Sequence, residues 1–483
     1  MRLLLLSFLG LPLFLSAQMQ VGWRTDTYAG INSALLNPAN PARTPYSWDL
    51  NLAEGSQFLA NNYAYLKQTN VMDLLRQRNN DLAFYFQQDI PGDLPTEKGA
   101  FVYDFLDNNQ YFGQSVTSVL GPSLSVRLAP RTRVGVFTRW QAVAGARKID
   151  ADLGYYPWEA LPDEQPFTLD KMAAAAATWT EVGVNLSQGF ATATGELTLG
   201  LSVRRLWGER GGYLFNEEPF NISKLPAAAG LEGNDFGIEA AFTNNATSED
   251  AFAATPGRGW GIDLGLLYQL DLGDGYYRWE FGGALLDVGA LRFTDSQKHL
   301  FNANAVTTTL TDNYNNFDPD LGFTELAEQF STDVFGSSSA SRIGDEFRLR
   351  LPTKVSLQAT YAFNEWAKVE ANALVNVAPM GGSLTSFTLL ALTPRIDRHW
   401  WSVALPLSFY AGEQLRLGLA GRLGPVFLGT DQLGSFVGKS NLTGADFYLG
   451  LKFFPWQIGS KKRGKNKSKG RRGGGKDVEC YQF

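Results

Sequence analysis

Apolar and polar residues alternate with a period of two in many segments of this chain. Leucines or valine at positions 197, 199, 201 and 203 alternate with polar residues or glycine, and the run from Trp260 to Leu270 repeats the pattern with Leu267 as an exception. Successive side chains of a β-strand point to opposite faces, so this pattern predicts strands with one apolar and one polar face. Membrane barrels need such strands, because lipid lies outside and a polar lumen inside. We therefore predict an all-β fold, a transmembrane antiparallel β-barrel.

The alternating segments predict about 14 strands. They lie near residues 46–53, 118–129, 132–144, 179–191, 195–207, 259–271, 276–292, 353–363, 366–378, 385–394, 400–410, 413–421, 424–430 and 444–456. An even number of strands places both ends of the barrel chain on the same side of the membrane.

Long and short connections alternate along the predicted barrel, which covers residues 46–456. Four long connections are expected at 54–117, 145–178, 208–258 and 293–352. The short ones fall at 130–131, 192–194, 272–275 and 364–365. Outer-membrane barrels have short periplasmic turns and longer external loops, whereas a soluble sandwich need not. We therefore expect the outer membrane of a Gram-negative bacterium, with both termini in the periplasm.

The polar faces of the predicted strands must line the lumen, because a charge facing hydrocarbon costs about 2–4 kcal/mol near the bilayer midplane. The expected lumen-lining residues are Glu181, Asn185, Arg204, Asp263, Glu280, Lys368, Glu370, Arg416 and Lys452. Their mixed signs favour an ion-paired interior that holds the wall or a plug in place. A solute pathway is the alternative.

The first residues are typical of a secretory signal peptide, predicted over residues 1–17. Arg2 precedes an apolar run from Leu3 to Leu15, and Ala17 offers a cleavage site. A single membrane anchor is the competing interpretation, but the run is shorter than the roughly 20 residues of a spanning helix. The chain has one cysteine and two histidines, which leaves no internal disulfide and no histidine-rich metal site. We expect no cofactor.

The C-terminal segment, residues 457–483, is predicted to be a flexible periplasmic tail. From Lys461 onward it holds nine basic and two acidic residues, with a glycine run at 473–475. Nucleic acid is the usual partner of such a run, but the export signal argues against it. Anionic lipid, cell-wall polymer or an acidic protein fits better, and a solvated tail without a partner is equally compatible. Candidate partner-binding residues are Lys461, Lys462, Arg463, Arg471, Arg472, Tyr481 and Phe483.

Short helices are predicted within the external connections, at residues 71–78, 170–178 and 325–330. The stretch 242–247 is typical of a surface turn. Such loops could carry a surface that binds proteins.

The stretch between the signal peptide and the first strand, residues 18–45, is predicted to be a plug. Its residues Ala29 to Ala42 are mostly small, and Pro38 and Pro41 cannot join a central strand ladder. We expect the stretch to lie inside the barrel; an ordered linker beneath the barrel is the alternative. The candidate plug residues are Asn32, Asn37, Pro38, Ala39, Asn40 and Pro41.

The Asn-Pro-Ala element at residues 37–39 resembles the lumen-entering N-terminal segment of the FadL-like outer-membrane barrels, and 14 strands is also that family's number. Residues 350–354, 286–289 and 417–426 resemble a Bacteroidota branch of this superfamily, a family of unknown function related to the PorV-type barrels of type IX secretion. The resemblance implies either uptake of hydrophobic molecules through a lateral wall opening or docking of secreted proteins.

Three functions follow as hypotheses. The favoured one is a non-enzymatic interaction component associated with secretion, which contacts outer-membrane lipid and periplasmic or secreted proteins. The second is a channel for hydrophobic small molecules. The third is a barrel hydrolase, which needs a nucleophile or paired acids beside a histidine. His299 is expected in an external loop and His399 in a periplasmic turn, so the two would not share a site.

Overall fold

The computed structural model describes residues 20–78, 80, 82–87, 98–150, 166–224, 231–246, 255–272, 276–308 and 322–455. The predicted signal peptide and basic tail lie outside these residues.

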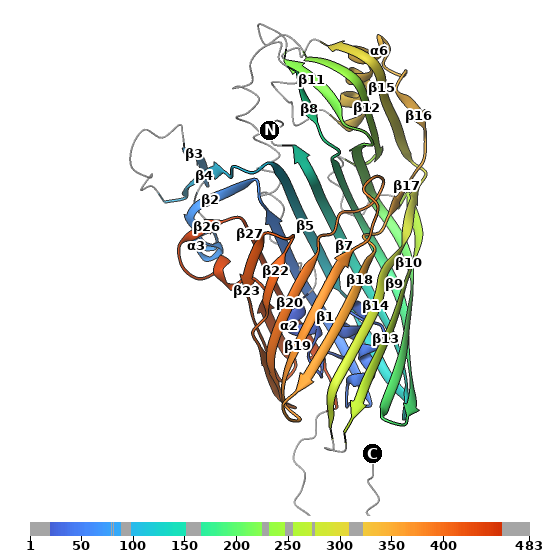
Figure 1. The fold of residues 1–483 in the computed structure, drawn as a ribbon, viewed down its shortest axis with the longest axis vertical. Coiled ribbons are helices and arrows are strands. Elements are labelled where there is room, and N and C mark those ends of the chain that lie inside the picture. Colours follow the sequence, from blue (N-terminus) through green and yellow to red (C-terminus); the bar gives the residue numbers. More distant parts are fainter. Residues whose placement is uncertain are drawn as a thin grey trace, which may run out of the picture.

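The described chain forms a closed antiparallel barrel of 14 strands (Figure 1). Four of these strands are interrupted, and the two pieces of each are counted as one strand. In wall order they are β1 (Trp48–Asn61), β5 with β6 (Gln110–Leu120, Ser123–Ala129), β7 (Thr132–Asp150), β9 (Ala173–Thr192), β10 (Gly195–Asn216), β13 (Gly257–Asp271), β14 (Tyr277–Phe293), β17 with β18 (Phe347–Arg350, Lys354–Ala362), β19 (Ala367–Asn376), β20 (Leu389–Asp397), β21 with β22 (Trp401–Ala404, Leu407–Tyr410), β23 with β24 (Gln414–Leu417, Leu419–Leu423), β25 (Val426–Thr430) and β27 (Gly444–Phe453). The barrel closes where Leu50 and Ala53 of β1 pair with Phe453 and Leu451 of β27.

The register places apolar side chains on the outside of the wall. Leu199 and Leu201 of β10 pair with Leu266 and Leu264 of β13, and all four are exposed. An outer surface of this kind is stable in hydrocarbon, so the barrel is a transmembrane barrel as predicted.

Among the described residues, no helix is both long enough and apolar enough to cross a membrane.

Short and long connections lie at opposite ends of the barrel, which we call the turn end and the loop end. Residues 130–131 and 193–194 form tight turns at the turn end. At the loop end, the strands run further than the sequence predicted. β1 continues to Asn61, β7 to Asp150 and β10 to Asn216, so the predicted loops 54–117, 145–178 and 208–258 begin too early. The predicted loop 293–352 likewise contains strands.

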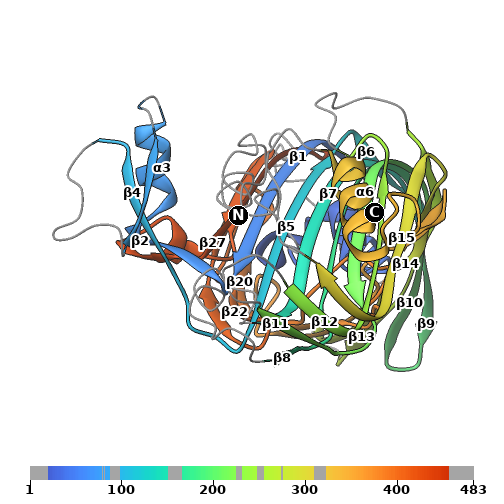
Figure 2. The ribbon, with the colours of Figure 1, turned by 90° about the horizontal axis from the view of Figure 1, so that it is seen from above.

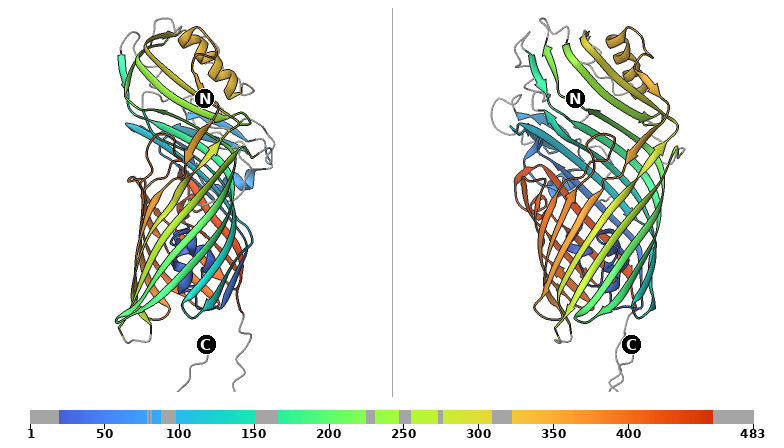
Figure 3. Two further views of the ribbon diagram at one scale, coloured as in Figure 1. Left: turned by 90° about the vertical axis from the view of Figure 1, so that its right-hand side faces the viewer. Right: turned by 45° about the vertical axis from the view of Figure 1, so that its right-hand side comes forward.

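At the loop end, five strands extend the wall into a hood (Figure 3). They are β8 (Pro166–Leu169), β11 (Phe220–Lys224), β12 (Leu231–Thr243), β15 (Ser296–Thr308) and β16 (Arg342–Gly344). Helix α6 (Phe323–Phe335) packs on this sheet through Ala327, which lies in a cluster with Phe242 and Phe301. Helix α6 contains the predicted helix 325–330.

The helix predicted at residues 170–178 is wrong, because β9 begins at Ala173. Alanine is a strong helix former, but only by tenths of a kcal/mol per residue over most others. Here Ala173–Thr178 pair with β10 on one side and with β7 on the other, which satisfies the backbone along two ladders. Tertiary pairing therefore outweighs local propensity.

A second sheet of four strands projects from the loop end and forms what we call the lateral lobe. It contains β2 (Ala64–Thr69), β3 (Ala83–Phe86), β4 (Ala100–Phe105) and β26 (Ser440–Leu442), together with helix α3 (Val71–Gln77). Helix α3 confirms the helix predicted at 71–78. Figure 2 shows the lobe extending beyond the circumference of the barrel.

Candidate functional site

The N-terminal segment, residues 20–47, lies inside the barrel near the turn end (Figures 1 and 3). It forms one turn of helix, α2 (Val21–Arg24), and two 3-10 turns, η1 (Gly30–Leu35) and η2 (Asn40–Arg43). All six candidate plug residues are buried. Short turns suit this segment, because Pro38 and Pro41 remove backbone donors that a longer helix or a strand would need.

A lysine from the last strand anchors the middle of the segment. Lys452 Nζ donates to the carbonyl oxygen of Ala29, 2.6 Å away, and to Asn32 Oδ1 at 3.1 Å, and it forms an ion pair with Asp49. Arg133 contacts the other oxygen of Asp49 at 3.0 Å. All of these side chains are buried, so the two cations and the hydrogen bonds compensate for desolvating the carboxylate.

The Asn-Pro-Ala element docks against the wall strands β9, β10 and β13. Asn185 and Ser187 of β9 donate to the carbonyl oxygen of Pro38 at 3.0 and 2.9 Å. Asn37 donates from Nδ2 to the backbone oxygen of Leu266 at 3.0 Å. These contacts satisfy polar groups on both sides of the interface.

Two glycines in the wall make room for this element. A β-carbon at Gly200 would overlap the backbone of Pro38 and Ala39, and one at Gly265 would overlap the side-chain oxygen of Asn37. Glycine within a strand often marks close approach of another backbone. Gly200 and Gly265 therefore serve the docking of the segment.

The end of the segment is held by ion pairs. Arg43 contacts Glu280 at 2.8 Å and Glu370 at 3.3 Å. Lys368 lies 3.8 Å from Glu280 and donates to Thr27 Oγ1 at 3.1 Å.

Above the segment lies what we call the charged layer, centred on Arg204. Its guanidinium contacts Glu181 at 3.2 Å, Asp263 at 2.7 Å and Asp287 at 3.0 Å. Arg139 pairs with Glu181 at 2.6 Å, and Lys354 pairs with Asp287 at 3.1 Å. Three cations thus balance three carboxylates, as buried charges require.

The predicted lumen residues divide into two groups. Eight of the nine lie in contacts with the N-terminal segment or in the charged layer. Arg416 instead packs its guanidinium over the rings of Tyr410 and Phe58, with centroids 4.2 and 5.1 Å away. The sequence did not single out Arg139, Asp287 and Lys354 as lumen residues, although Asp287 and Lys354 lie in the stretches 286–289 and 350–354 that carry the family resemblance.

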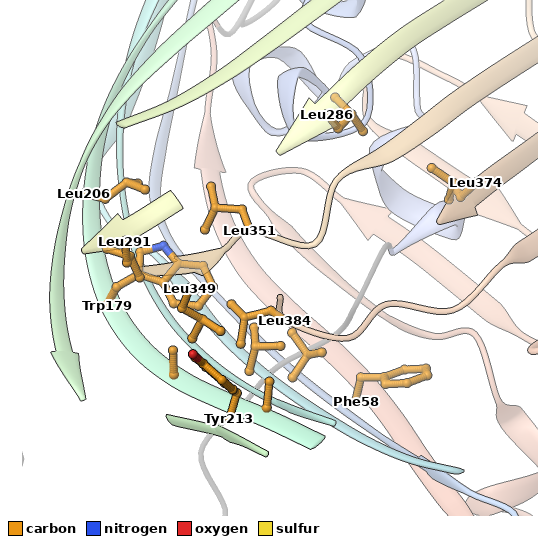
Figure 4. Close-up of a cluster of buried hydrophobic side chains, with 14 of the residues drawn as sticks. Phe58, Trp179, Leu206, Tyr213, Leu286, Leu291, Leu349, Leu351, Leu374 and Leu384 are labelled. Atoms are coloured by element: carbon orange, nitrogen blue, oxygen red, sulfur yellow. The ribbon is translucent and has the colours of Figure 1, made fainter. Parts of the chain in front are cut away.

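Toward the loop end the interior becomes apolar (Figure 4). We call this group the apolar cluster; its members include Trp179, Leu206, Tyr213, Leu286, Leu291, Phe293, Leu349, Leu351 and Leu384. Residues 377–388 fold inward to contribute Leu384, and Gln114 fixes this loop by donating to the carbonyl oxygen of Thr385 at 2.8 Å. A cavity of about 40 Å³ remains between the charged layer and the apolar cluster, lined by Arg24, Trp179 and Leu286 among others.

The apolar cluster was missed, although its signal is present in the sequence. Trp179 precedes Glu181 by two positions and Leu206 follows Arg204 by two, so strand alternation places each on the same inner face as its charged neighbour.

The two histidines lie far apart. His299 is in β15 of the hood, while His399 follows β20 at the turn end. Within the described residues, no group of three or more histidine, cysteine or acidic side chains is arranged to hold a metal ion.

A family model described as "Family of unknown function (DUF5723)" matches residues 38–431. No curated protein matches the chain.

Similar solved structures include the TodX deltaS2S3 mutant, a monoaromatic hydrocarbon channel, with 10% identity, coverage of 92% of this chain and 99% of that one, and a TM-score of 0.41. The Pseudomonas putida toluene transporter TodX is 10% identical, with coverage of 89% and 94% and a TM-score of 0.38. The Ralstonia pickettii toluene transporter TbuX is 11% identical, with coverage of 88% and 93% and a TM-score of 0.37. At such scores these structures carry no argument about what this chain binds.

Proposed function

We propose a function for this chain, which belongs to the family of unknown function DUF5723, from the way in which its lumen is filled. The protein is a non-enzymatic outer-membrane component that binds other proteins and is associated with secretion. Its N-terminal segment is a plug, its loop end faces the cell exterior, and its turn end faces the periplasm. The main support for this proposal is that buried ion pairs of Arg24 and Arg43, together with hydrogen bonds from the wall, hold the segment inside the lumen.

The hood supports protein binding at the loop end. It extends the wall well past the barrel, and it carries apolar side chains that remain about half exposed, such as Phe323 and Ile343. A pore needs no such structure, whereas exposed apolar side chains on a rigid sheet are suitable contacts for a partner. The basic tail is proposed as a second contact, for periplasmic proteins.

A second candidate function, a channel for hydrophobic small molecules, is favoured by the apolar cluster. Leu349, Leu351 and Leu384 line the interior on the loop-end side of the plug, where an apolar solute would first enter. Passage would then require the charged layer and the segment to move. We rank this function second because the cavity of about 40 Å³ between the two layers is far below the roughly 300 Å³ at which ligand pockets begin.

Co-purification from native membranes distinguishes the two functions. The full chain, a variant lacking Lys461–Phe483 and a variant lacking Ile31–Ala42 would each be isolated and their bound proteins identified. We expect a defined partner set for the full chain and loss of its periplasmic members without the tail. If the variant without the tail binds the same proteins as the full chain, the tail is not a binding site for periplasmic proteins.

A liposome-swelling assay, which measures the entry of small solutes, is the second part of the test. The full chain should not admit small solutes, and the variant lacking Ile31–Ala42 should admit them. Uptake of toluene or a fatty acid by the full chain, with no co-purified protein, would favour the channel instead.

A further inference from the structure

The lateral lobe projects sideways from the loop end of the barrel, over the area that a surrounding bilayer would occupy (Figures 1 and 2). Figure 1 shows helix α3 level with the upper ends of β22, β23 and β27. These strands carry outward-facing residues such as Leu415, which is 72% exposed, and Leu449. Helix α3 therefore lies at the height where the lipid-facing surface of the barrel ends.

Helix α3 is amphipathic, and its apolar side is not buried. Val71, Met72, Leu74 and Leu75 fall on one side of the helix. Arg76 follows Met72 by one turn and lies at the edge of that side, whereas Asp73 lies on the opposite side. No residue of α3 is buried, and Met72 is 39% exposed. A helix of 7 residues would not be stable on its own in water, so contacts with other parts of the lobe or with another surface must stabilise it.

Hydrogen bonds of Asn70 cap α3 and attach it to the residues beside β26. The side chain of Asn70 caps the helix by accepting from the backbone N–H of Asp73 at 2.9 Å, and it donates to the carbonyl oxygen of Gly438 at 2.6 Å. Beside this contact, Val437 is 65% exposed.

Aromatic pairs form the interior of the lobe. The ring centroids of Tyr63 and Phe105 lie 4.8 Å apart, and those of Phe86 and Tyr103 lie 5.4 Å apart. Such packing holds the strands of the lobe together.

We propose that the apolar side of α3, with Val437, rests in the head-group region of the surrounding membrane leaflet. This surface continues the lipid-facing wall, and the overhang of the lobe brings it over lipid. Arg76, Arg78 and Lys439 border the apolar residues and are exposed. Long basic side chains can extend toward phosphate groups while their stems cover apolar surface. The partner is therefore a lipid surface, and the lobe fixes the depth of the barrel in the membrane.

Site-directed spin labelling tests this placement. In a chain carrying Cys480→Ser, a nitroxide is attached after Met72→Cys, Asp73→Cys or Leu415→Cys. The protein is then inserted into phosphatidylcholine vesicles with and without an anionic phospholipid. Collision of each label with oxygen, which concentrates in lipid, is compared with collision with a water-soluble nickel chelate. Asp73 is the matched control on the other side of the same helix, and Leu415 is the lipid-exposed reference.

We expect the label at position 72 to lose nickel accessibility and gain oxygen accessibility, approaching the label at 415, while the label at 73 stays accessible to nickel. Equal nickel accessibility at 72 and 73 would overturn the proposal. Equal protection of both would also overturn it, because burial in protein rather than lipid would then cover the helix. Heat-modifiable migration of each variant confirms that the barrel has folded.

Discussion

The two halves of the lumen are filled by opposite chemistry, although exposed apolar side chains cover much of the outer surface of the same strands. Near the turn end, the N-terminal segment and the charged layer are held by Lys452, Arg43 and Arg204. Near the loop end, Leu349, Leu351 and Trp179 pack without ion pairs of their own. The inner face of a strand therefore changes character along its length.

This difference shows what determines the structure of each half of the lumen. Buried ion pairs add little net stability compared with apolar packing, but breaking one leaves an uncompensated charge. The charged half therefore favours a single arrangement of the N-terminal segment. Apolar contacts are non-directional, so the loop-end half contributes stability with less demand on geometry.

The largest effect is expected from Arg204→Met in the charged layer. Removing this cation leaves Glu181, Asp263 and Asp287 short of a partner, which should lower the free energy of unfolding by about 3–5 kcal/mol. Urea unfolding in lipid vesicles would measure it. As the matched control, Arg292→Met removes an ion pair with Glu346 in which both side chains are more than half exposed, and it should change little. Equal effects of the two variants would contradict the role of the layer.

In the apolar cluster, Leu349→Ala should lower the free energy of unfolding by about 2–5 kcal/mol, because the fully buried side chain leaves a cavity. Unlike disruption of the segment, this change should leave the barrel closed to ions. Ile343→Ala, at a half-exposed position of the hood, is the control and should have a smaller effect. Ion conduction by the Leu349 variant would show that the two halves do not close the lumen independently.

The smallest effect concerns His299 in the hood, which lies between the rings of Phe242 and Phe301. Burial, and secondarily the charge of Arg342, lowers the pKa of this imidazole below its ordinary 6.5. The folded hood therefore favours neutral histidine, and its stability is full above the ordinary pKa and declines as the pH falls through the lowered one.

Limited proteolysis of the hood should accordingly be faster at a pH of about 5.5 than at about 7.5, and His299→Gln should reduce this dependence. The same pH dependence in the variant would assign it to other groups.

Strand alternation predicted the wall and most of the charged interior, because both depend on which face a side chain occupies. Arg204 and Asp263, for example, were predicted to line the lumen because they lie on the polar face of an alternating strand. The lateral lobe could not be predicted in this way, because β2 pairs with β26, which is remote in sequence. The roles of Gly200 and Gly265 also escaped prediction, because a strand sequence does not show what lies against its inner face.

The central claim is that the chain closes its own barrel, and the conductance of planar lipid bilayers tests it most directly. Gly200→Ala combined with Gly265→Ala leaves the N-terminal segment unaltered but fills the space in which Asn37 and Pro38 dock. Gly283→Ala, whose β-carbon would meet only ordinary contacts, is the matched control. We predict no steady ion current for the natural chain or the control and a clear current for the double variant. A natural chain that conducts as well as the double variant would contradict the account.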